Sequence, residues 1–136
     1  MDELMTEAKL EKMDAVLDFV NAHLADCPLK VQNQIAIAVD EIFANIARYA
    51  YHPDVGSVTV RISVGDAVTI EFEDRGAAYD PLAREAPDIS SPAEARPIGG
   101  LGIFMVRNLM DSVEYRREGY RNILTIKKEL PYNAWR

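Results

Sequence analysis

A carboxylate, an amide and a guanidinium lie at helical spacing in an otherwise apolar stretch, DEIFANIARYAY, residues 40–51. At about 100° per residue, Glu41, Asn45 and Arg48 fall within about 60° of one another on one helix face. A solvated polar face explains any one of them. An Asn oxygen also suits Mg²⁺ beside phosphate oxygens and water, and a nearby Glu can take a proton from a hydroxyl that attacks phosphorus. The stripe alone leaves both interpretations open.

A second polar motif follows an alternating apolar segment, in EDRGAAYDP, residues 73–81. Asp74 ends the alternation and Gly76 comes two residues later. An ordinary strand-ending turn accounts for this pair equally well. A carboxylate also accepts strongly from an exocyclic amine such as the adenine 6-amino group. A glycine allows the backbone to approach a planar ring and to adopt a positive φ.

A third motif is rich in glycine: RPIGGLGIF, residues 96–104. Gly99, Gly100 and Gly102 lead directly into an apolar helical pattern, without the spacing of a dinucleotide fingerprint or the lysine of a P-loop. Glycines at a helix start leave backbone N–H groups accessible, and the helix dipole favours an anion there. A plain helix start is the alternative.

Apolar periodicity indicates which elements carry these motifs. The apolar residues recur at helical spacing over 9–25, 29–50 and 101–113. Strands are expected at 3–8 and at four segments that alternate in pairs: 57–64 with 67–74, and VEYRRE (113–118) with NILTIKKEL (122–130). Short turns at Gly65-Asp66 and Gly119-Tyr120 predict that each pair is a hairpin. This order predicts an α+β two-layer sandwich, with three helices covering one face of a mostly antiparallel sheet.

Composition sets limits on the class of protein. The 136 residues suit one domain, 1–136, and a 49% hydrophobic fraction is enough to form a core. A net charge of −7 disfavours nucleic acid or an anionic membrane as a partner. There is no apolar run of the roughly 18–20 residues that span a bilayer, and the acidic N-terminus is unlike a signal peptide. The single Cys27 excludes an internal disulfide and suits a cytoplasmic protein.

Taken together and in this order, the three motifs resemble the N, G1 and G2 boxes of the GHKL, or histidine-kinase-like, ATPase superfamily. The boxes would be E-x-x-x-N at Glu41–Asn45, D-x-G at Asp74–Gly76 and G-x-G at Gly100–Gly102. Within the superfamily, AVDEIFANIARYAY, EDRGAAYDP and GGLGIFMVRNLMDSVEYRREGYRNILTIKK look like the stand-alone anti-sigma factor serine/threonine kinases. The resemblance covers about residues 8–129.

The resemblance implies a role for each motif. Asn45 would hold Mg²⁺ and Glu41 would be the general base. Asp74 would bind the adenine amino group of ATP, while Gly76 would give the ring room. The phosphates would meet backbone N–H groups of the third motif, at Gly99, Gly100 and Gly102.

Other assignments rest on the same resemblance. Thr125 would join Asp74 at adenine through water, although an outward-facing strand Thr is an equal alternative. The region from Arg75 to Ile98 has no periodicity, and about 77–98 would form the ATP lid. From this lid Arg96 could reach the γ-phosphate, although a solvated Arg explains it as well.

The function implied is an ATP-dependent serine/threonine kinase that phosphorylates a STAS-domain anti-anti-sigma partner and thereby controls partner switching. A sigma factor as a second partner and a homodimeric state are further expectations from the family. The alternatives are a non-catalytic ATP-sensing binding module and a structural domain without a nucleotide site.

Overall fold

The computed structural model describes residues 1–83 and 100–130. Within these ranges the chain forms three α-helices, five strands and three shorter helical turns. Their bounds in chain order are β1 Asp2–Glu7, η1 Leu10–Lys12, α1 Met13–Ala22, α2 Leu29–Asn45, η2 Ile46–Ala50, β2 Ser57–Val64, β3 Ala67–Asp74, η3 Pro81–Ala83, α3 Gly100–Leu109, β4 Ser112–Glu118 and β5 Arg121–Glu129. The predicted lid, 77–98, falls mostly outside the described residues, as do Arg96 and Gly99.

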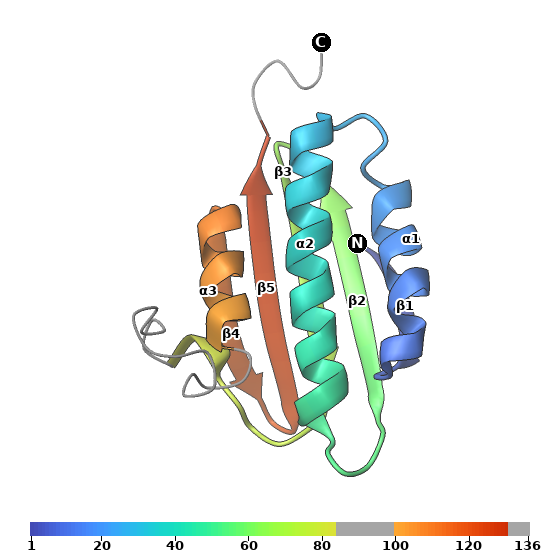
Figure 1. The fold of residues 1–136 in the computed structure, drawn as a ribbon, viewed down its shortest axis with the longest axis vertical. Coiled ribbons are helices and arrows are strands. Elements are labelled where there is room, and N and C mark those ends of the chain that lie inside the picture. Colours follow the sequence, from blue (N-terminus) through green and yellow to red (C-terminus); the bar gives the residue numbers. More distant parts are fainter. Residues whose placement is uncertain (84–99, 131–136) are drawn as a thin grey trace.

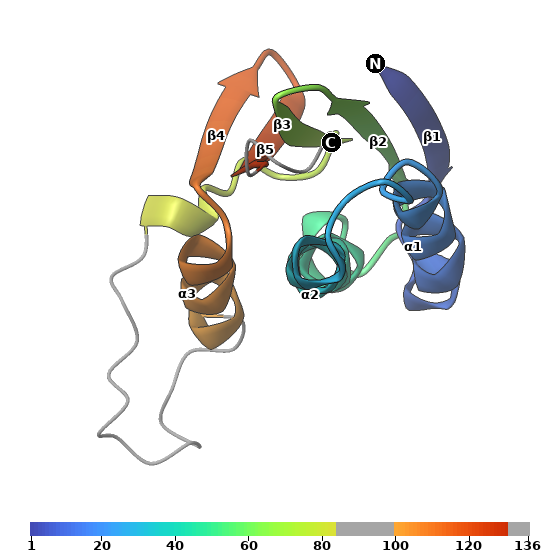
Figure 2. The same ribbon diagram turned by 90° about the horizontal axis from the view of Figure 1, so that it is seen from above.

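The five strands of the described residues form one antiparallel sheet in the order β1-β2-β3-β5-β4. All three helices lie on the same face of this sheet, with α2 between α1 and α3 (Figures 1 and 2). The predicted two-layer α+β sandwich is therefore confirmed. Both predicted hairpins are present, and Gly119 in the β4–β5 turn has a φ of +59°, a conformation that glycine adopts readily.

The core between the two layers follows the apolar periodicity. On α2, residues one turn apart such as Ile35, Val39 and Phe43 are fully buried, and on β3 the alternate residues Ile70 and Phe72 face them. Each large side chain removed from water in this way stabilises the fold by about 1.5–3 kcal/mol. These contacts fix which side of α2 faces the sheet.

The outer face of the sheet has no second layer among the described residues and is covered by charged side chains. Arg61 of β2 lies between Glu3 of β1 and Glu73 of β3, at 2.9 and 3.1 Å. Arg121 of β5 approaches the same Glu73 at 3.0 Å. Neighbouring strands are thus linked by ion pairs on the face that does not pack against helices.

The first and third helices end earlier than the periodic patterns predict. The first helix begins with the 3₁₀ turn η1 and ends at Ala22, short of the predicted 25. The second continues past Asn45 as the π-helical turn η2 to Ala50, so its predicted extent to 50 is reached. The third ends at Leu109 rather than 113, because the Asp111 backbone N–H donates to Lys127 of β5 at 2.9 Å and sheet pairing begins at Ser112.

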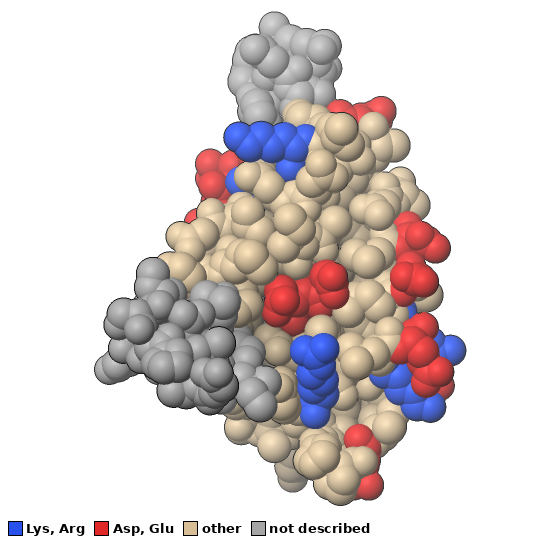
Figure 3. Space-filling view, viewed as in Figure 1, with Lys and Arg blue, Asp and Glu red and all other residues tan. Residues whose placement is uncertain are grey.

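The helix face of the molecule carries acidic side chains over α2 and along α1 (Figure 3). The acidic residues of α2 are Asp40 and Glu41. In the part of the chain that the structure describes, none of the helices combines the length and apolar character needed to cross a membrane.

Candidate functional site

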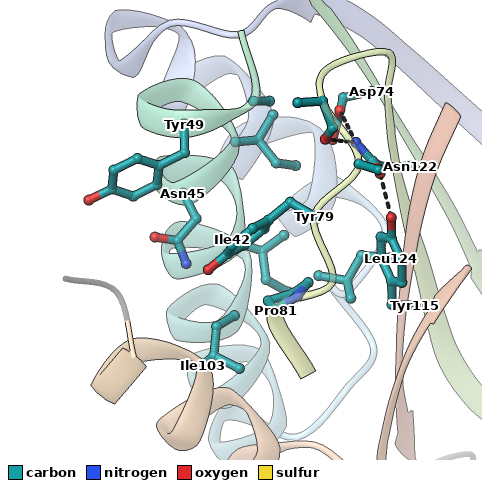
Figure 4. A pocket seen from close by; sticks show the side chains of 14 residues that line it. Ile42, Asn45, Tyr49, Asp74, Tyr79, Pro81, Ile103, Tyr115, Asn122 and Leu124 are labelled. Carbon is teal, nitrogen blue, oxygen red and sulfur yellow. Dashed lines mark hydrogen bonds between the residues drawn. The ribbon is translucent and has the colours of Figure 1, made fainter. Parts of the chain in front are cut away.

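A pocket of about 200 Å³ opens between α2, α3 and the ends of β3 and β5. Its surface is mostly apolar, with polar groups at two ends. In Figure 4, Asn45 projects from α2 on one side, Asp74 and Asn122 lie on the other, and Ile42 and Leu124 lie lower in the view. The lining residues are Ile42, Asn45, Ile46, Tyr49, Ala50, Asp74, Ala77, Ala78, Tyr79, Pro81, Ile103, Tyr115, Asn122 and Leu124. An apolar cleft with a few placed polar groups is typical of a site for a planar organic ligand.

Asp74 closes the strand end of the pocket. It continues the inward-facing series of β3, after Ile70 and Phe72, and is itself buried. Its Oδ1 accepts hydrogen bonds from the Gly76 backbone N–H and from Asn122 Nδ2, both at 2.9 Å. Among the described residues no donor is found for Oδ2. A buried carboxylate with one oxygen left over can accept from an amino group of a ligand.

Gly76 lies where the chain leaving β3 passes the end of the second helix. A Cβ built on Gly76 would lie 2.1 Å from the carbonyl oxygen of Ala50, and the next backbone N–H, of Ala77, donates to that same oxygen at 3.1 Å. The expectation of a positive φ is wrong, since Gly119 is the glycine with that conformation among the described residues. Gly76 is needed here for close packing of two backbones.

The π-helical turn η2 supplies that carbonyl. Its wider winding places Tyr49 and Ala50 at the pocket, one turn beyond Asn45. The following residue, Tyr51, donates to the Ser57 carbonyl at 2.6 Å and accepts from the Arg75 backbone N–H at 2.7 Å. Burial raises the pKa of the Tyr51 hydroxyl above its ordinary value. This hydroxyl stays neutral and holds the turn after β3 in place.

The helix stripe and the glycine motif meet beside the pocket. A Cβ built on Gly102 would lie 2.1 Å from Oε2 of Glu41. Glu41 is half-buried and has no hydrogen bond or ion pair to another described residue. Gly100 is the first residue of α3, so the N-terminal N–H groups of this helix lie close to the carboxylate. Arg48 is exposed and does not line the pocket.

Asn45 is the residue best suited to a metal ion. Its side chain lines the pocket, one helical turn after Glu41, and makes no hydrogen bond to another described residue. The described residues contain no cluster of three or more His, Cys, Asp or Glu side chains that could hold a metal by themselves. A Mg²⁺ ion with one protein oxygen, phosphate oxygens and waters fits this donor set.

Thr125 does not reach Asp74. In the regular antiparallel register, Thr125 pairs with Glu71, and Asp74 pairs with Asn122. Side chains on successive residues point to opposite faces, so Thr125 lies on the outer face of the sheet, away from the pocket. The assignment of Thr125 to the adenine site does not hold in the structure.

Asn122 takes the place next to Asp74, and the sequence analysis missed it. The signal was present in the alternation of β5: Leu124 and Ile126 face inward, and counting two residues back reaches Asn122. The chain entering β5 is polar, which hid this inward position.

The residues 6–128 match the histidine kinase-like ATPase domain family. The chain belongs to that family. This membership implies ATP as the nucleotide and accounts for the fold and for the order of the three boxes.

Individual members of known kinase families are also similar to this chain. Over 96 residues the chain is 32% identical to the serine-protein kinase RsbW of Bacillus cereus strain ATCC 10987; the match covers 67% of this chain and 60% of that protein's length. Among solved structures, the histidine kinase domain of the Erythrobacter litoralis EL346 blue-light activated histidine kinase aligns with a TM-score of 0.56 at 18% identity, over 93% of this chain and 61% of that one. The Acinetobacter baumannii histidine kinase AdeS aligns with a TM-score of 0.54 at 15% identity, over 96% and 69%. The two structural likenesses show the shared fold.

Proposed function

We propose that this protein binds Mg·ATP in the described pocket and transfers its γ-phosphoryl group to a serine of a STAS-domain anti-anti-sigma partner. Phosphorylation would release that partner and change which protein the kinase holds, as in an anti-sigma factor that switches partners. Support comes from the family membership and from the similarity to a protein named as a serine-protein kinase.

The observation that carries the proposal is the position of Glu41. Its carboxylate lies against Gly102, at the end of α3 where phosphates would bind. The dipole of α3 stabilises a carboxylate at this end, and the same place puts Glu41 within reach of a ligand phosphate held by the helix N-terminus. A general base for a hydroxyl attacking the γ-phosphorus needs this proximity.

Different residues along the pocket would contact the adenine, the phosphates and the Mg²⁺ ion. Asp74 Oδ2 would accept from the adenine amino group, and the apolar side chains of Ile42 and Leu124 would contact the ring. Backbone N–H groups at Gly100 and Gly102 would position the phosphates. Asn45 would supply an oxygen to Mg²⁺, which neutralises phosphate charge when bound. Gly99 and Arg96 lie outside the described residues, and the resemblance alone would assign them to the phosphates.

Glu41 would act as the general base in the transfer step. The serine oxygen forms a bond to the γ-phosphorus, the bond from that phosphorus to the β–γ bridging oxygen breaks, and ADP leaves. The serine proton passes to the Glu41 carboxylate. Positioning and electrostatics supply most of the acceleration in such a transfer, and a placed base adds about 10²–10⁴-fold.

A homodimeric state, a sigma factor as second partner and a cytoplasmic location complete the proposal. The dimer and the sigma factor rest on the resemblance to anti-sigma kinases, and the cytoplasmic location rests on the single Cys27. The net charge of −7 disfavours direct contact with nucleic acid or anionic membranes.

Phosphate transfer from Mg·ATP to the STAS protein encoded by a neighbouring gene tests the proposal. Glu41→Gln should transfer at least about 10²-fold more slowly than wild type while still binding ATP. Asp40→Asn, a neighbouring exposed acid on the same helix, is the matched control and should transfer normally. Phosphate transfer by Glu41→Gln at the wild-type rate would show that Glu41 is not the general base. ATP binding without transfer by the wild type would instead indicate a nucleotide-sensing module.

A further inference from the structure

The amide of Asn122 is hydrogen-bonded at both ends, although it is buried at the pocket wall. Its Nδ2 donates to Asp74 Oδ1 and to the Ala77 carbonyl, both at 2.9 Å, with the Gly76 carbonyl at 3.4 Å. Its Oδ1 accepts from the Tyr115 hydroxyl at 2.6 Å and from Arg117 Nη1 at 3.0 Å. Figure 4 shows the row from Tyr115 through Asn122 to Asp74.

The surroundings allow this amide only one orientation. Every group that faces Nδ2 is an acceptor: one carboxylate oxygen and two backbone carbonyls. The groups that face Oδ1 are donors, because the Arg117 guanidinium has no acceptor and Tyr115 supplies its O–H. A rotation by 180° would place the amide oxygen against the Asp74 carboxylate, so Arg117 and Tyr115 fix which end faces Asp74.

This arrangement leaves the two oxygens of Asp74 in different states. Oδ1 accepts from both Gly76 and Asn122, and a carboxylate oxygen held by two donors cannot turn without breaking both bonds. Oδ2 is left as an acceptor at a fixed place in the pocket. Residues of the β4–β5 hairpin therefore fix the orientation of the Asn122 amide, and the amide in turn fixes the orientation of the Asp74 carboxylate.

We propose that Tyr115, Arg117 and Asn122 are positioning residues that aim Asp74 Oδ2 and thereby make the pocket select a purine with an exocyclic amino group over one with a carbonyl there. This inference rests on the proposed binding of ATP. An adenine 6-amino group donates to a fixed Oδ2. The 6-carbonyl of hypoxanthine would face the carboxylate lone pairs without a proton between them, which a rigid site rejects more strongly than a mobile one.

The test compares the affinities for Mg·ATP and Mg·ITP by calorimetry. Tyr115→Phe keeps the ring in the pocket wall and removes one bond to Asn122 Oδ1. It should lower ATP affinity about 2- to 10-fold, the value of one hydrogen bond, while ITP affinity changes less. Asn122→Leu should reduce the ATP-to-ITP ratio further. If Asn122→Leu does not fold, Tyr115→Phe decides.

The control variant is Thr125→Val, on the same strand but on the outer face. It should keep the wild-type ratio. If the Asn122 and Tyr115 variants lose affinity for ATP and ITP equally, the ratio is unchanged and the residues have a merely structural role, which would overturn the inference. A wild type that binds ATP and ITP with equal affinity would overturn it too. A wild type that binds neither nucleotide would overturn the proposed function itself.

Discussion

An amide at position 74 would keep the shape of the Asp74 carboxylate but would lose its charge and replace one acceptor oxygen with a donor. Asp74→Asn can keep its oxygen toward Gly76 and Asn122, so the turn should hold its shape. Its new Nδ2 would then face the adenine amino group, donor against donor. We expect ATP affinity to fall about 10- to 100-fold, the value of a hydrogen bond to a charged group.

The same change should help a base with a carbonyl. In calorimetry, Asp74→Asn should bind Mg·ITP better relative to Mg·ATP than wild type does. An unchanged preference with lowered affinity for both nucleotides would mean that Asp74 shapes the pocket without contacting the base.

Replacement of Asn45 tests whether this residue contributes to a Mg²⁺ site in the pocket. Asn45→Ala should weaken binding of Mg·ATP by about 10-fold but leave binding of ATP in the presence of EDTA nearly unchanged, because the lost oxygen serves the metal. Thermal unfolding gives a second measurement, since ligand at 100 times its Kd stabilises the wild type by about 2.7 kcal/mol. Asn33→Ala, an exposed amide on the same helix, is the control. Equal loss with and without the metal would contradict the assignment.

At the scale of elements, the turn after β3 packs on the end of the second helix through Gly76. The neighbour that a side chain would meet there is backbone, the Ala50 carbonyl at 2.1 Å, and it cannot move without unwinding η2. Gly76→Ala should therefore destabilise the fold by about 1–3 kcal/mol in urea unfolding. Gly65→Ala is the matched control, because a Cβ at Gly65 meets nothing within 4 Å. Equal stabilities for the two variants would refute this packing role.

At Gly102, in contrast to Gly76, a side chain should affect phosphoryl transfer more than stability. A Cβ at Gly102 meets the carboxylate end of Glu41, a side chain that can turn away. Gly102→Ala should leave the free energy of unfolding within about 1 kcal/mol of wild type. It should nonetheless slow phosphoryl transfer by about 10-fold or more, because the proposed base is displaced. A large loss of stability with normal transfer per folded molecule would contradict this account.

At the scale of the whole molecule, His23 joins the end of α1 to the first strand. Its Nε2 lies 2.8 Å from Asp2 Oδ2 and its Nδ1 lies 2.8 Å from the Phe19 carbonyl. Both neighbours are acceptors, so the doubly protonated ring is favoured, and the hydrogen bond to Asp2 is the main cause that raises the pKa of His23 above its ordinary value of 6.5. The charged ring thus ties the helix layer to the sheet.

The sign of the pH dependence follows from that shift. A raised pKa in the folded state gives stability that is fully present below the unfolded pKa, about 6.5, and is lost as the pH rises through the folded value. The stability difference between wild type and His23→Gln should therefore be larger at pH 6 than at pH 9 in urea unfolding. Asp2→Asn should remove the same pH dependence. Parallel pH profiles for all three proteins would exclude the contribution.

Local sequence patterns determined most of the fold. The period of apolar residues distinguished helices from strands, and the turns Gly65-Asp66 and Gly119-Tyr120 paired the strands into hairpins that the structure confirms. These features depend on residues close together in the chain, so the sequence alone is enough. The ordered boxes likewise predicted the family, and Glu41, Asn45 and Asp74 all lie in or beside the pocket.

Only the tertiary structure decided which residues accompany them. The register of β3 on β5, set by packing across the whole sheet, places Asn122 rather than Thr125 beside Asp74. The reason for Gly76 lies in Ala50, 26 positions earlier in the chain, and the reason for Gly102 lies in Glu41. A sequence shows that a small or polar residue is present; the neighbour that requires it is chosen by packing between segments far apart in the chain, which no local pattern encodes.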